Sequence, residues 1–326
     1  MPALKAPLRS LGMRTKQQWF GRGPVPVRAQ NGRQLQLTGV RDNYLSFQLF
    51  WFGMEYYEPE TVFLLNELLS EGTTFFDIGA NIGYYALHVG MCHPEIRVVA
   101  FEPHPRNFAL LSLNVKRNRL KSVTCEAQAV SSSRGSAQLH LSASAMSSSL
   151  EAGFSHVRNG ENLEVPMESI DLYVREHGIV GPMVMKIDVE GHERQALEGA
   201  MKTLASHKPD LLIEVAEPFA KDPYPMLREL GYHSYQISEQ GLVEVTELSP
   251  TIHGHVWFSN YLFSARSPEA IQNISARLQA EMAKVDFLRT SCQVDDAKIR
   301  RLTRVRSIAR EPVFRPPNAP IVRALK

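Results

Sequence analysis

The stretch FFDIGANIGYY, Phe75 to Tyr85, decides the fold class. Two apolar residues run into an acid, and glycines then alternate with an alanine and an asparagine, so the chain leaves a buried strand and turns sharply. Gly79 and Gly83 allow the backbone to turn and to approach a ligand closely, which a larger residue would not. The stretch therefore predicts a ligand-binding turn at the end of a strand.

Short apolar runs and helical stretches alternate along the chain from Thr73 onward. The runs are rich in Val, Ile, Leu or Phe and are typical of buried strands: TTFFDIG, RVVAFEP, SVTCEAQAV, PMVMKIDVEG and DLLIEV. Apolar residues at intervals of three and four predict helices over 107–118 and 193–204. This alternation predicts an α/β fold with a doubly wound, mostly parallel sheet.

Three further segments extend this prediction. YHSYQIS and SNYLFSAR, near the end of the α/β region, are expected to form two more strands. The serine-rich run 131–153 interrupts the alternation. It is either a low-complexity loop or a binding loop beside the strand ends, with a short extra strand at AQLHLS.

The two ends of the chain differ from its body in charge. The composition of the 326-residue chain, with 44% hydrophobic residues, 21% charged residues and a net charge of +2, is that of an ordinary globular protein. Residues 1–41 contain eight Lys or Arg and no acid, and residues 298–326 contain nine with one acid, which leaves 19 basic and 33 acidic residues between them. The basic ends are either solvated or in contact with an anionic partner or membrane surface. The acidic body disfavours nucleic acid as a partner.

These changes in character divide the chain into three predicted regions. We expect a basic N-terminal leader over 1–45, the α/β domain over 46–266, and a long helix with a Pro-rich basic tail over 267–326. Apolar residues of the last region form a heptad pattern, interrupted by Glu281 and Asp295, at Ile271, Ile274, Leu278, Val285, Leu288, Cys292, Ile299 and Leu302. The helix therefore either packs on its own domain or forms a coiled coil in a homodimer.

Export, membrane and disulfide signals are missing from the sequence as it stands. The N-terminal MPALKAPLRSLGMRTKQQWFGRG has positive charge but no continuous apolar segment, and no run approaches the length of a membrane span. Cys92, Cys125 and Cys292 lie far apart, which argues against a disulfide framework and against a zinc site. We therefore expect a cytoplasmic protein with no integral membrane segment.

Acids at two strand ends indicate the kind of ligand. Ligands of doubly wound sheets bind beyond the carboxyl ends of the strands, and a dinucleotide fingerprint G-x-G-x-x-G would place a pyrophosphate over the glycines. Here the pattern is D-x-G-x-N-x-G, in which Asp77 would repel a pyrophosphate but favour a cation, and Asn81 supplies an amide. Glu102, about twenty residues later, is placed to accept hydrogen bonds from ribose hydroxyls. These features predict S-adenosylmethionine, with Gln128 and Ala129 near the adenine edge.

The run VMKIDVEGHERQAL, Val184 to Leu197, concentrates the reactive side chains. Methyl transfer to a hydroxyl requires that the acceptor be oriented and its proton accepted, and the candidates are Asp188, Glu190 and His192. His192 is either the base, oriented by a carboxylate, or a residue that only starts the following helix. Asp188 either assists the chemistry or holds the cofactor ammonium. The three side chains could also hold a divalent ion, but their spacing is no specific metal signature, and we predict no metal site.

In these motifs the chain resembles the FkbM-type S-adenosylmethionine-dependent methyltransferases, from about Phe52 to Ser264. The likeness rests on GMEYYEPE, FFDIGANIGYYAL, AFEPHPRNFALLSLNVKRN, AQAVSSSRGSAQLHL, ESIDLYV, MKIDVEGHERQALEGA and KPDLLIEV, in the order of the family. The resemblance implies a Rossmann-like class I methyltransferase fold and mostly O-methylation of sugars or secondary metabolites, so a small-molecule or glycan acceptor. It also implies cofactor positions at Asp77, Gly79, Asn81, Gly83 and Glu102, with Asp188, Glu190 and His192 lining the active site.

Three rival functions remain at this point. An N-methyltransferase acting on nucleic acid would be expected to carry an Asp/Asn-Pro-Pro-Tyr type motif after the fourth strand, whereas DPYP occurs after the fifth. A nucleotide-dependent oxidoreductase would need the absent G-x-G-x-x-G. A binding protein that assembles through its C-terminal helix would have no need of the intact KIDVEGHE.

Overall fold

The computed structural model describes residues 23–38, 45, 46, 49, 57–141, 148–151, 162–216, 224–238, 240–246, 248 and 258–291. Residues 1–22 of the predicted leader, the heptad positions from Cys292 on and the Pro-rich tail lie outside these ranges. Within the described part of the chain, no helix is both long and apolar enough to cross a membrane.

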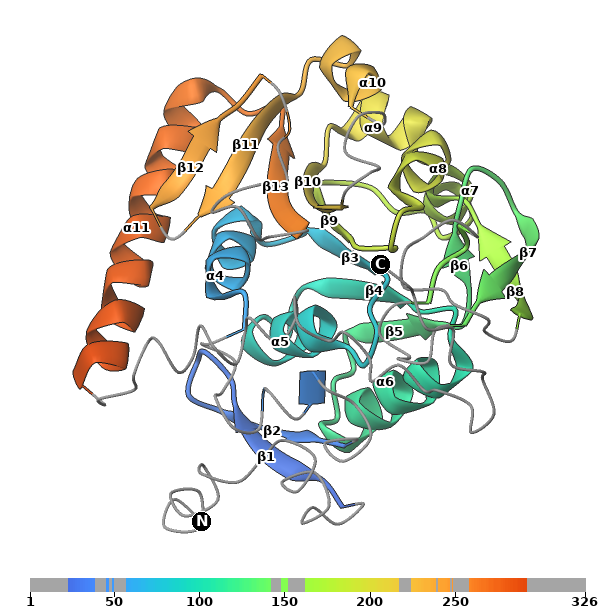
Figure 1. Cartoon of the computed structure of the whole chain (residues 1–326), viewed down its shortest axis with the longest axis horizontal. Helices are drawn as coiled ribbons and strands as arrows, with labels where there is room; N and C mark the ends of the chain where they lie inside the picture. The colour runs from blue at the N-terminus through green and yellow to red at the C-terminus, as the bar shows by residue number, and fades with distance from the viewer. Residues whose placement is uncertain are drawn as a thin grey trace, which may run out of the picture.

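An eight-stranded sheet forms the centre of the molecule (Figure 1). Its strands run in the order β12-β11-β13-β10-β9-β3-β4-β5. Their bounds are β3 Thr74–Ile78, β4 Arg97–Phe101, β5 Val123–Glu126, β9 Met183–Ile187, β10 Asp210–Ala216, β11 His233–Ser238, β12 Gly241–Glu244 and β13 Phe258–Ser264. Strands β5, β4, β3, β9 and β10 pair in parallel, while β13 is antiparallel to both β10 and β11. The predicted Rossmann-like, mostly parallel α/β fold is therefore confirmed.

Helices cover both faces of this sheet. On one side lie α4 Pro59–Leu68, α5 Tyr84–Cys92 and α6 Pro105–Arg117, and on the other α7 Ile170–Glu176, α8 Glu193–Glu198, α9 Met201–His207 and α10 Pro225–Glu229 (Figure 1). Side chains alternate along each strand, so Phe75 packs under the first group while Phe76 packs under the second. The two apolar cores thus lie on opposite faces of one sheet.

The strand order reverses beside β3, and this reversal locates the binding edge. From β3 the chain proceeds outward to β4 and β5, and then returns to form β9 on the other side of β3. In doubly wound sheets the crevice at such a switch point, beyond the carboxyl ends of the strands, is where ligands bind. The stretch FFDIGANIG lies at this point, as predicted.

A small second sheet accounts for part of the serine-rich run. Strands β6 Ala129–Val130, β7 Gly135–His140 and β8 Asn162–Glu168 pair in the order β6-β8-β7. The possible strand at AQLHLS is therefore real as β7, whereas the sequence patterns predicted neither β8 nor α7.

The predicted single helix over 193–204 is wrong, because the chain breaks after α8 and starts again as α9. A Cβ at Gly199 would lie 2.0 Å from the carbonyl oxygen of Ser131, so only glycine fits this close approach. The carboxylate of Asp171 then accepts hydrogen bonds from the main-chain N–H groups of Lys202 (2.9 Å) and Thr203 (2.8 Å). It caps the new N-terminus and so fixes the start of α9.

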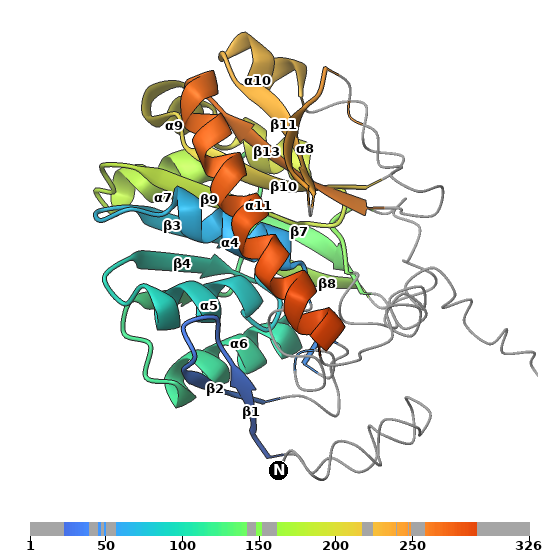
Figure 2. The same cartoon turned by 90° about the vertical axis from the view of Figure 1, so that its left-hand side faces the viewer.

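Both ends of the described chain pack on the domain. The hairpin of β1 Val25–Arg28 and β2 Gln34–Leu37, within the predicted leader, contacts α6, where Asn114 accepts from the N–H of Thr38 at 2.8 Å. Helix α11 Pro268–Ser291 packs against α4 (Figure 2) and β12 (Figure 1), and its buried residues are Ile271, Ile274, Leu278 and Met282. Over these residues the heptad pattern serves packing within the chain.

Candidate functional site

The turn after β3 is held against the end of β9. Gly79 has φ +83, and a Cβ on it would lie 1.9 Å from the carbonyl oxygen of Asp188. The N–H groups of Gly79 and Ala80 donate to the carbonyl of Phe101 on β4, at 3.0 and 2.9 Å. The close approach predicted from this glycine is therefore to the protein backbone of β9. Its role toward a ligand stays a prediction.

Gly83 ends the same turn and precedes α5. Its φ is +93, and a Cβ here would lie 2.5 Å from Cδ1 of Leu111 on α6. As a glycine, the N-cap residue Gly83 has no side chain to cap α5. Oδ2 of Asp77 caps the helix instead and accepts from the N–H of Ala86 at 2.9 Å. Asp77 is only 2% exposed, and burial raises the pKa of its carboxyl to about 7, against the opposing effects of the Ala86 N–H and Lys186.

Glu102 joins the turn to the end of β4. Its Oε2 accepts from the N–H of Asn81 and its Oε1 from the N–H of His104, each at 2.8 Å. Asn81 has φ +52, so its backbone turns toward this carboxylate. Burial raises the pKa of Glu102 to about 7, although the N–H groups of His104 and Asn81 lower it. The structure thus brings together Asp77, Gly79, Asn81, Gly83 and Glu102 around one turn.

The predicted adenine positions follow β5. The N–H of Glu102 donates to the carbonyl of Glu126 at 3.0 Å, which places the end of β5 beside Glu102. Gln128 is half-buried, and Ala129 is buried at the start of β6, where it pairs with Met167. The segment therefore borders the same strand edge.

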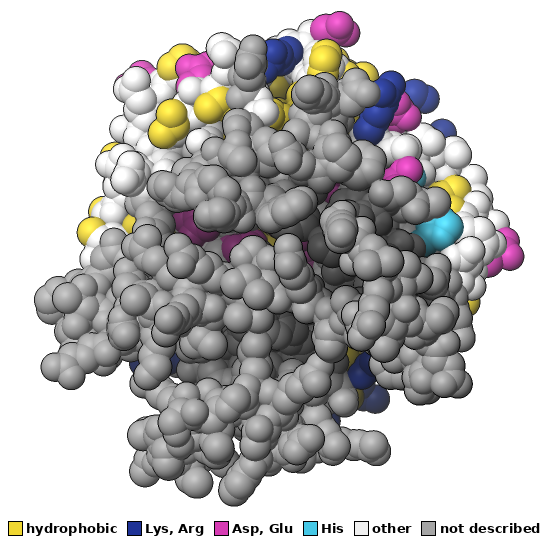
Figure 3. Space-filling model, viewed as in Figure 1, with side chains coloured by type: hydrophobic (Ala, Val, Ile, Leu, Met, Phe, Trp, Pro, Cys, Tyr) yellow, Lys and Arg dark blue, Asp and Glu magenta, His cyan; other side chains and the backbone are white. Residues whose placement is uncertain are grey.

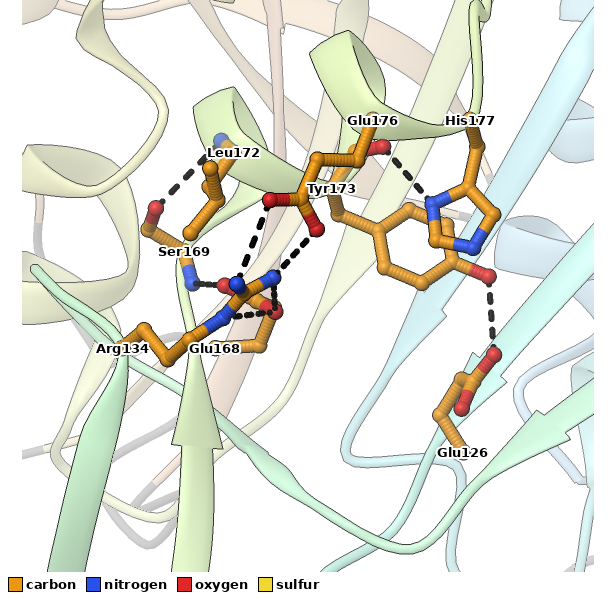
Figure 4. Close-up of polar contacts among 8 residues, drawn as sticks. All are labelled: Glu126, Arg134, Glu168, Ser169, Leu172, Tyr173, Glu176 and His177. Atoms are coloured by element: carbon orange, nitrogen blue, oxygen red, sulfur yellow. Dashed lines mark hydrogen bonds and ion pairs between the residues drawn. The ribbon is translucent and has the colours of Figure 1, made fainter.

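A polar network anchors this segment to α7 (Figure 4). Arg134 donates to the buried Glu168 at 2.7 Å and to Glu176 at 2.5 Å, and the hydroxyl of Tyr173 donates to Glu126 at 2.9 Å. These contacts fix both ends of the connection from β5 to β7. They hold the border of the site in place.

The turn that follows β9 has an uncommon backbone conformation. Glu190 and Gly191 both have positive φ, +54 and +98. Oε1 of the buried Glu193 accepts from the N–H groups of Val189 (3.3 Å) and Gly191 (3.1 Å), and Ser149 donates to the carbonyl of Glu190 at 2.6 Å. Glu193 therefore shapes the turn, and the burial that this role requires raises its pKa to about 7.

His192 connects this turn to the small sheet. The side chain is 9% exposed, with Nε2 2.9 Å from Oγ of Ser131 and Nδ1 2.8 Å from Oε1 of Glu151. Gln195 also donates to Glu151, at 3.0 Å. Both ring nitrogens thus have protein partners, and in the described part of the chain neither partner is Asp188. That Asp188, Glu190 and His192 line one active site stays a prediction.

Asp188 contacts two charged residues, Lys186 of its own run and Glu214 of β10, of which the sequence patterns did not single out Glu214. Its Oδ2 lies 3.4 Å from Nζ of Lys186, and it shares a hydrogen bond with Glu214 of β10. Glu214 interrupts the apolar run DLLIEV, and an acid inside a buried strand was the signal that could have identified it. Among the described residues, no group of three or more His, Cys, Asp or Glu is placed to hold a metal ion.

Comparison with known proteins identifies a family whose model matches this chain. Residues 77–236 match the family model described as the methyltransferase FkbM domain. A hexuronic acid methyltransferase, AglP, from Haloferax volcanii is 32% identical over 149 residues, which cover 46% of this chain and 59% of that protein. A 31-O-demethyl-FK506 methyltransferase, FkbM, from Streptomyces tacrolimicus is 30% identical over 158 residues, which cover 40% and 60%. The chain thus covers less than two thirds of either curated relative.

One solved structure is a methyltransferase FkbM from Methylobacillus flagellatus KT. It is 18% identical and superposes with a TM-score of 0.40, over 67% of this chain and 52% of that one.

Proposed function

Because the chain belongs to the FkbM-type methyltransferases, we propose that it transfers a methyl group from S-adenosylmethionine to a hydroxyl of a sugar or secondary metabolite. The two relatives support this acceptor class by their names, since one acts on a hexuronic acid and the other on an oxygen of FK506. The acceptor is thus a small molecule or glycan.

The observation that carries the proposal is the pair of buried carboxylates on either side of the glycine turn. Asp77 is 2% exposed and Glu102 5%, and burial raises the pKa of both. A ligand that brings hydroxyl donors and positive charge would stabilise both carboxylates, whereas a pyrophosphate would not. The residues present therefore fit S-adenosylmethionine, with Glu102 toward the ribose hydroxyls. When bound, this cofactor supplies an electrophilic methyl group on a sulfonium.

The remaining residues shape the site around the ligand. Gly79, Asn81 and Gly83 hold the turn in its left-handed conformation, and Gln128 and Ala129 are proposed to border the adenine. Asp188 lies at the end of β9, next to the turn, and we assign it to the acceptor side. An N-methyltransferase and a nucleotide-dependent oxidoreductase are the two alternatives.

Product analysis with a methyl-labelled donor tests the proposal. The full chain is incubated with methyl-labelled S-adenosylmethionine and with pools of sugar nucleotides, glycolipids, proteins and nucleic acids. We expect label in an alkali-stable ether on a sugar or metabolite oxygen. Label only on protein or nucleic acid would refute the acceptor class, and label on nitrogen would favour the first alternative.

A further inference from the structure

Polar side chains occupy one face of the main sheet where its strands end. Cross-strand pairs place Asp77 opposite Lys186, and Glu214 opposite Asn260. Side chains two residues apart share a face, so Asp188 lies on this face with Lys186. Deeper on it, apolar residues pack under α4 and α5: Phe75, Val184, Leu212 and Leu262. The face therefore changes from apolar to polar at the binding edge. Figure 3 shows some acidic side chains near the middle of the molecule in the same view as Figure 1.

Lys186 is the central residue of this polar end. Its side chain is 1% exposed, and in the described part of the chain its Nζ has no hydrogen-bond partner. The ammonium lies 3.4 Å from Oδ2 of Asp188 and 5.6 Å from the ring centre of Tyr85. Burial lowers the pKa of Lys186, but Asp188, Glu214, Glu58 and Asp77 together raise it above its usual value. The lysine is therefore a buried cation with unused hydrogen-bond donors.

Asp188 and Glu214 form a carboxyl pair beside this cation. A hydrogen bond between two carboxyl groups requires a proton on one of them, and burial and Asp188 raise the pKa of Glu214 well above its usual range. Glu214 thus keeps a proton that it donates to Asp188. A carboxylate can accept about four hydrogen bonds, so Asp188 can accept from a further donor beside Glu214.

Glu58, just before α4, belongs to the same cluster. Its Oε2 accepts from the hydroxyl of Tyr85 at 2.6 Å and from Nδ2 of Asn260 at 3.2 Å. Oδ1 of Asn260 is buried and, among the described residues, lacks a hydrogen-bond partner. Two buried polar atoms, this oxygen and the Lys186 ammonium, are thus left for a ligand at the same strand ends.

We propose that Lys186, Asp188 and Glu214 form the acceptor site of the methyltransferase, and that the group they bind is a neutral hydroxyl. This inference rests on the proposed function and makes it more specific. A hydroxyl oxygen accepts from the Lys186 ammonium while its proton is donated to Asp188, so one group bonds to both residues.

The other common methyl acceptors fit this arrangement less well. A protonated amine has no lone pair to accept from Lys186 and is repelled by it. A carboxylate would accept from Lys186 but would lie among Glu58, Asp77 and Asp188, whose charges oppose it. A neutral hydroxyl alone meets both the donor and the acceptor without adding charge.

The same residues account for the proton in the transfer. The acceptor oxygen bonds to the methyl carbon, the carbon–sulfur bond breaks with its electron pair left on sulfur, and the hydroxyl proton passes to Asp188. Glu214 keeps its own proton throughout, and the proton on Asp188 is later released to solvent. Acceptance of a proton by a positioned carboxylate is typically worth about a hundred- to ten-thousandfold in rate.

Three matched sugars test the site. Methyl α-glucopyranoside, its 6-amino-6-deoxy analogue and its 6-carboxylate differ in one group, which is a hydroxyl, an ammonium or a carboxylate. Their binding to the full chain is measured in the presence of S-adenosylhomocysteine. We expect the wild type to prefer the neutral sugar by at least about tenfold over each charged analogue. Lys186→Met should shift the preference toward the ammonium, Asp188→Asn should shift it toward the carboxylate, and the control Glu198→Gln should shift neither.

The outcomes separate this inference from the proposed function. A wild type that fails to bind S-adenosylhomocysteine contradicts the proposed function itself. If the homocysteine analogue binds, the inference is overturned by equal affinity for the three sugars, by preference for a charged one, or by no saturable binding of any. If Lys186→Met does not fold, the wild-type preference and Asp188→Asn still test the inference. A shift of the Asp188→Asn preference toward the ammonium sugar also overturns the inference.

Discussion

The main-chain N–H of Asn81 donates to Oε2 of Glu102 at 2.8 Å, and this contact joins the glycine turn after β3 to the end of β4. Oε1 of the same carboxylate accepts from the N–H of His104. One buried acid therefore holds both the turn after β3 and the end of β4 in place. A ligand that bonds to Glu102 therefore meets a carboxylate whose position is already fixed.

Gly79→Ala should destabilise the fold more than Gly72→Ala. Both glycines have almost the same φ, +83 and +81, so both substitutions carry the left-handed penalty of about 1–2 kcal/mol. Only at Gly79 would the new Cβ meet the carbonyl of Asp188, whereas nothing lies within 4 Å at Gly72. We expect an additional loss of about 1–3 kcal/mol in the free energy of unfolding, measured in urea. Equal losses would contradict the contact between the turn and β9.

Stability without ligand should fall as the pH rises through 7. The folded-state pKa of Glu102 is raised from 4.5 to about 7, so the folded chain binds more protons than the unfolded chain between these values. The contribution of Glu102 to stability is thus fully present below about pH 4.5 and is lost by about pH 8. The loss amounts to roughly 3 kcal/mol for this group. Urea unfolding at pH 5 and pH 8 measures the loss, which should shrink in Glu102→Gln. A wild type that is more stable at pH 8 than at pH 5 would contradict the burial of the Glu102 carboxyl.

Asp188→Asn should lower turnover by about a hundred- to ten-thousandfold, because it removes the group that takes the acceptor proton. His192→Ala should lower it by less than about tenfold, since both ring nitrogens already have the partners Ser131 and Glu151. It should instead lower the free energy of unfolding by about 1–3 kcal/mol, through the loss of two buried hydrogen bonds. Initial rates and thermal melting measure the two effects. The reverse ranking of rates would return the base role to His192.

Leu278→Ala should destabilise the monomer by about 2–5 kcal/mol, because Leu278 is fully buried where α11 meets the domain. Gln272→Ala, on the exposed side of the same helix, serves as the control. Unfolding in urea measures the stability, and light scattering measures the mass. If α11 served mainly as a coiled coil, Leu278→Ala would lower the mass while leaving the unfolding of the monomer unchanged.

The fold could be predicted from sequence because its strands are buried on both faces. Continuous apolar runs such as RVVAFEP mark the parallel strands, and acids at their ends mark the binding edge. Strand β8 has no such run, because Leu163, Val165 and Met167 alternate with exposed residues, and one of these is Pro166, a residue that argues against a strand. The break at Gly199 likewise depends on Ser131, which is distant in the sequence.

The candidate site could be predicted only in part, for the same reason. Asp77 and Glu102 belong to local motifs, so their positions at one edge follow from the alternation of elements. The cluster around Lys186 depends on the register between β9, β10 and β13, which no local pattern supplies. Glu214 and Asn260 are cross-strand neighbours from separate segments, and the contact of Glu214 with Asp188 emerges only in the folded sheet.

Calorimetry of the full chain with S-adenosylhomocysteine and with NADH tests the central claim most directly. Glu102→Gln is the variant to compare, since its amide oxygen still accepts from one of the N–H groups of Asn81 and His104, whereas Glu102→Ala would leave both without an acceptor. The exposed Glu198→Gln is the control. We predict saturable binding of S-adenosylhomocysteine, weakened by about 1–3 kcal/mol in Glu102→Gln and unchanged in the control, with no saturable binding of NADH. Saturable binding of NADH without any response to S-adenosylhomocysteine would contradict the account.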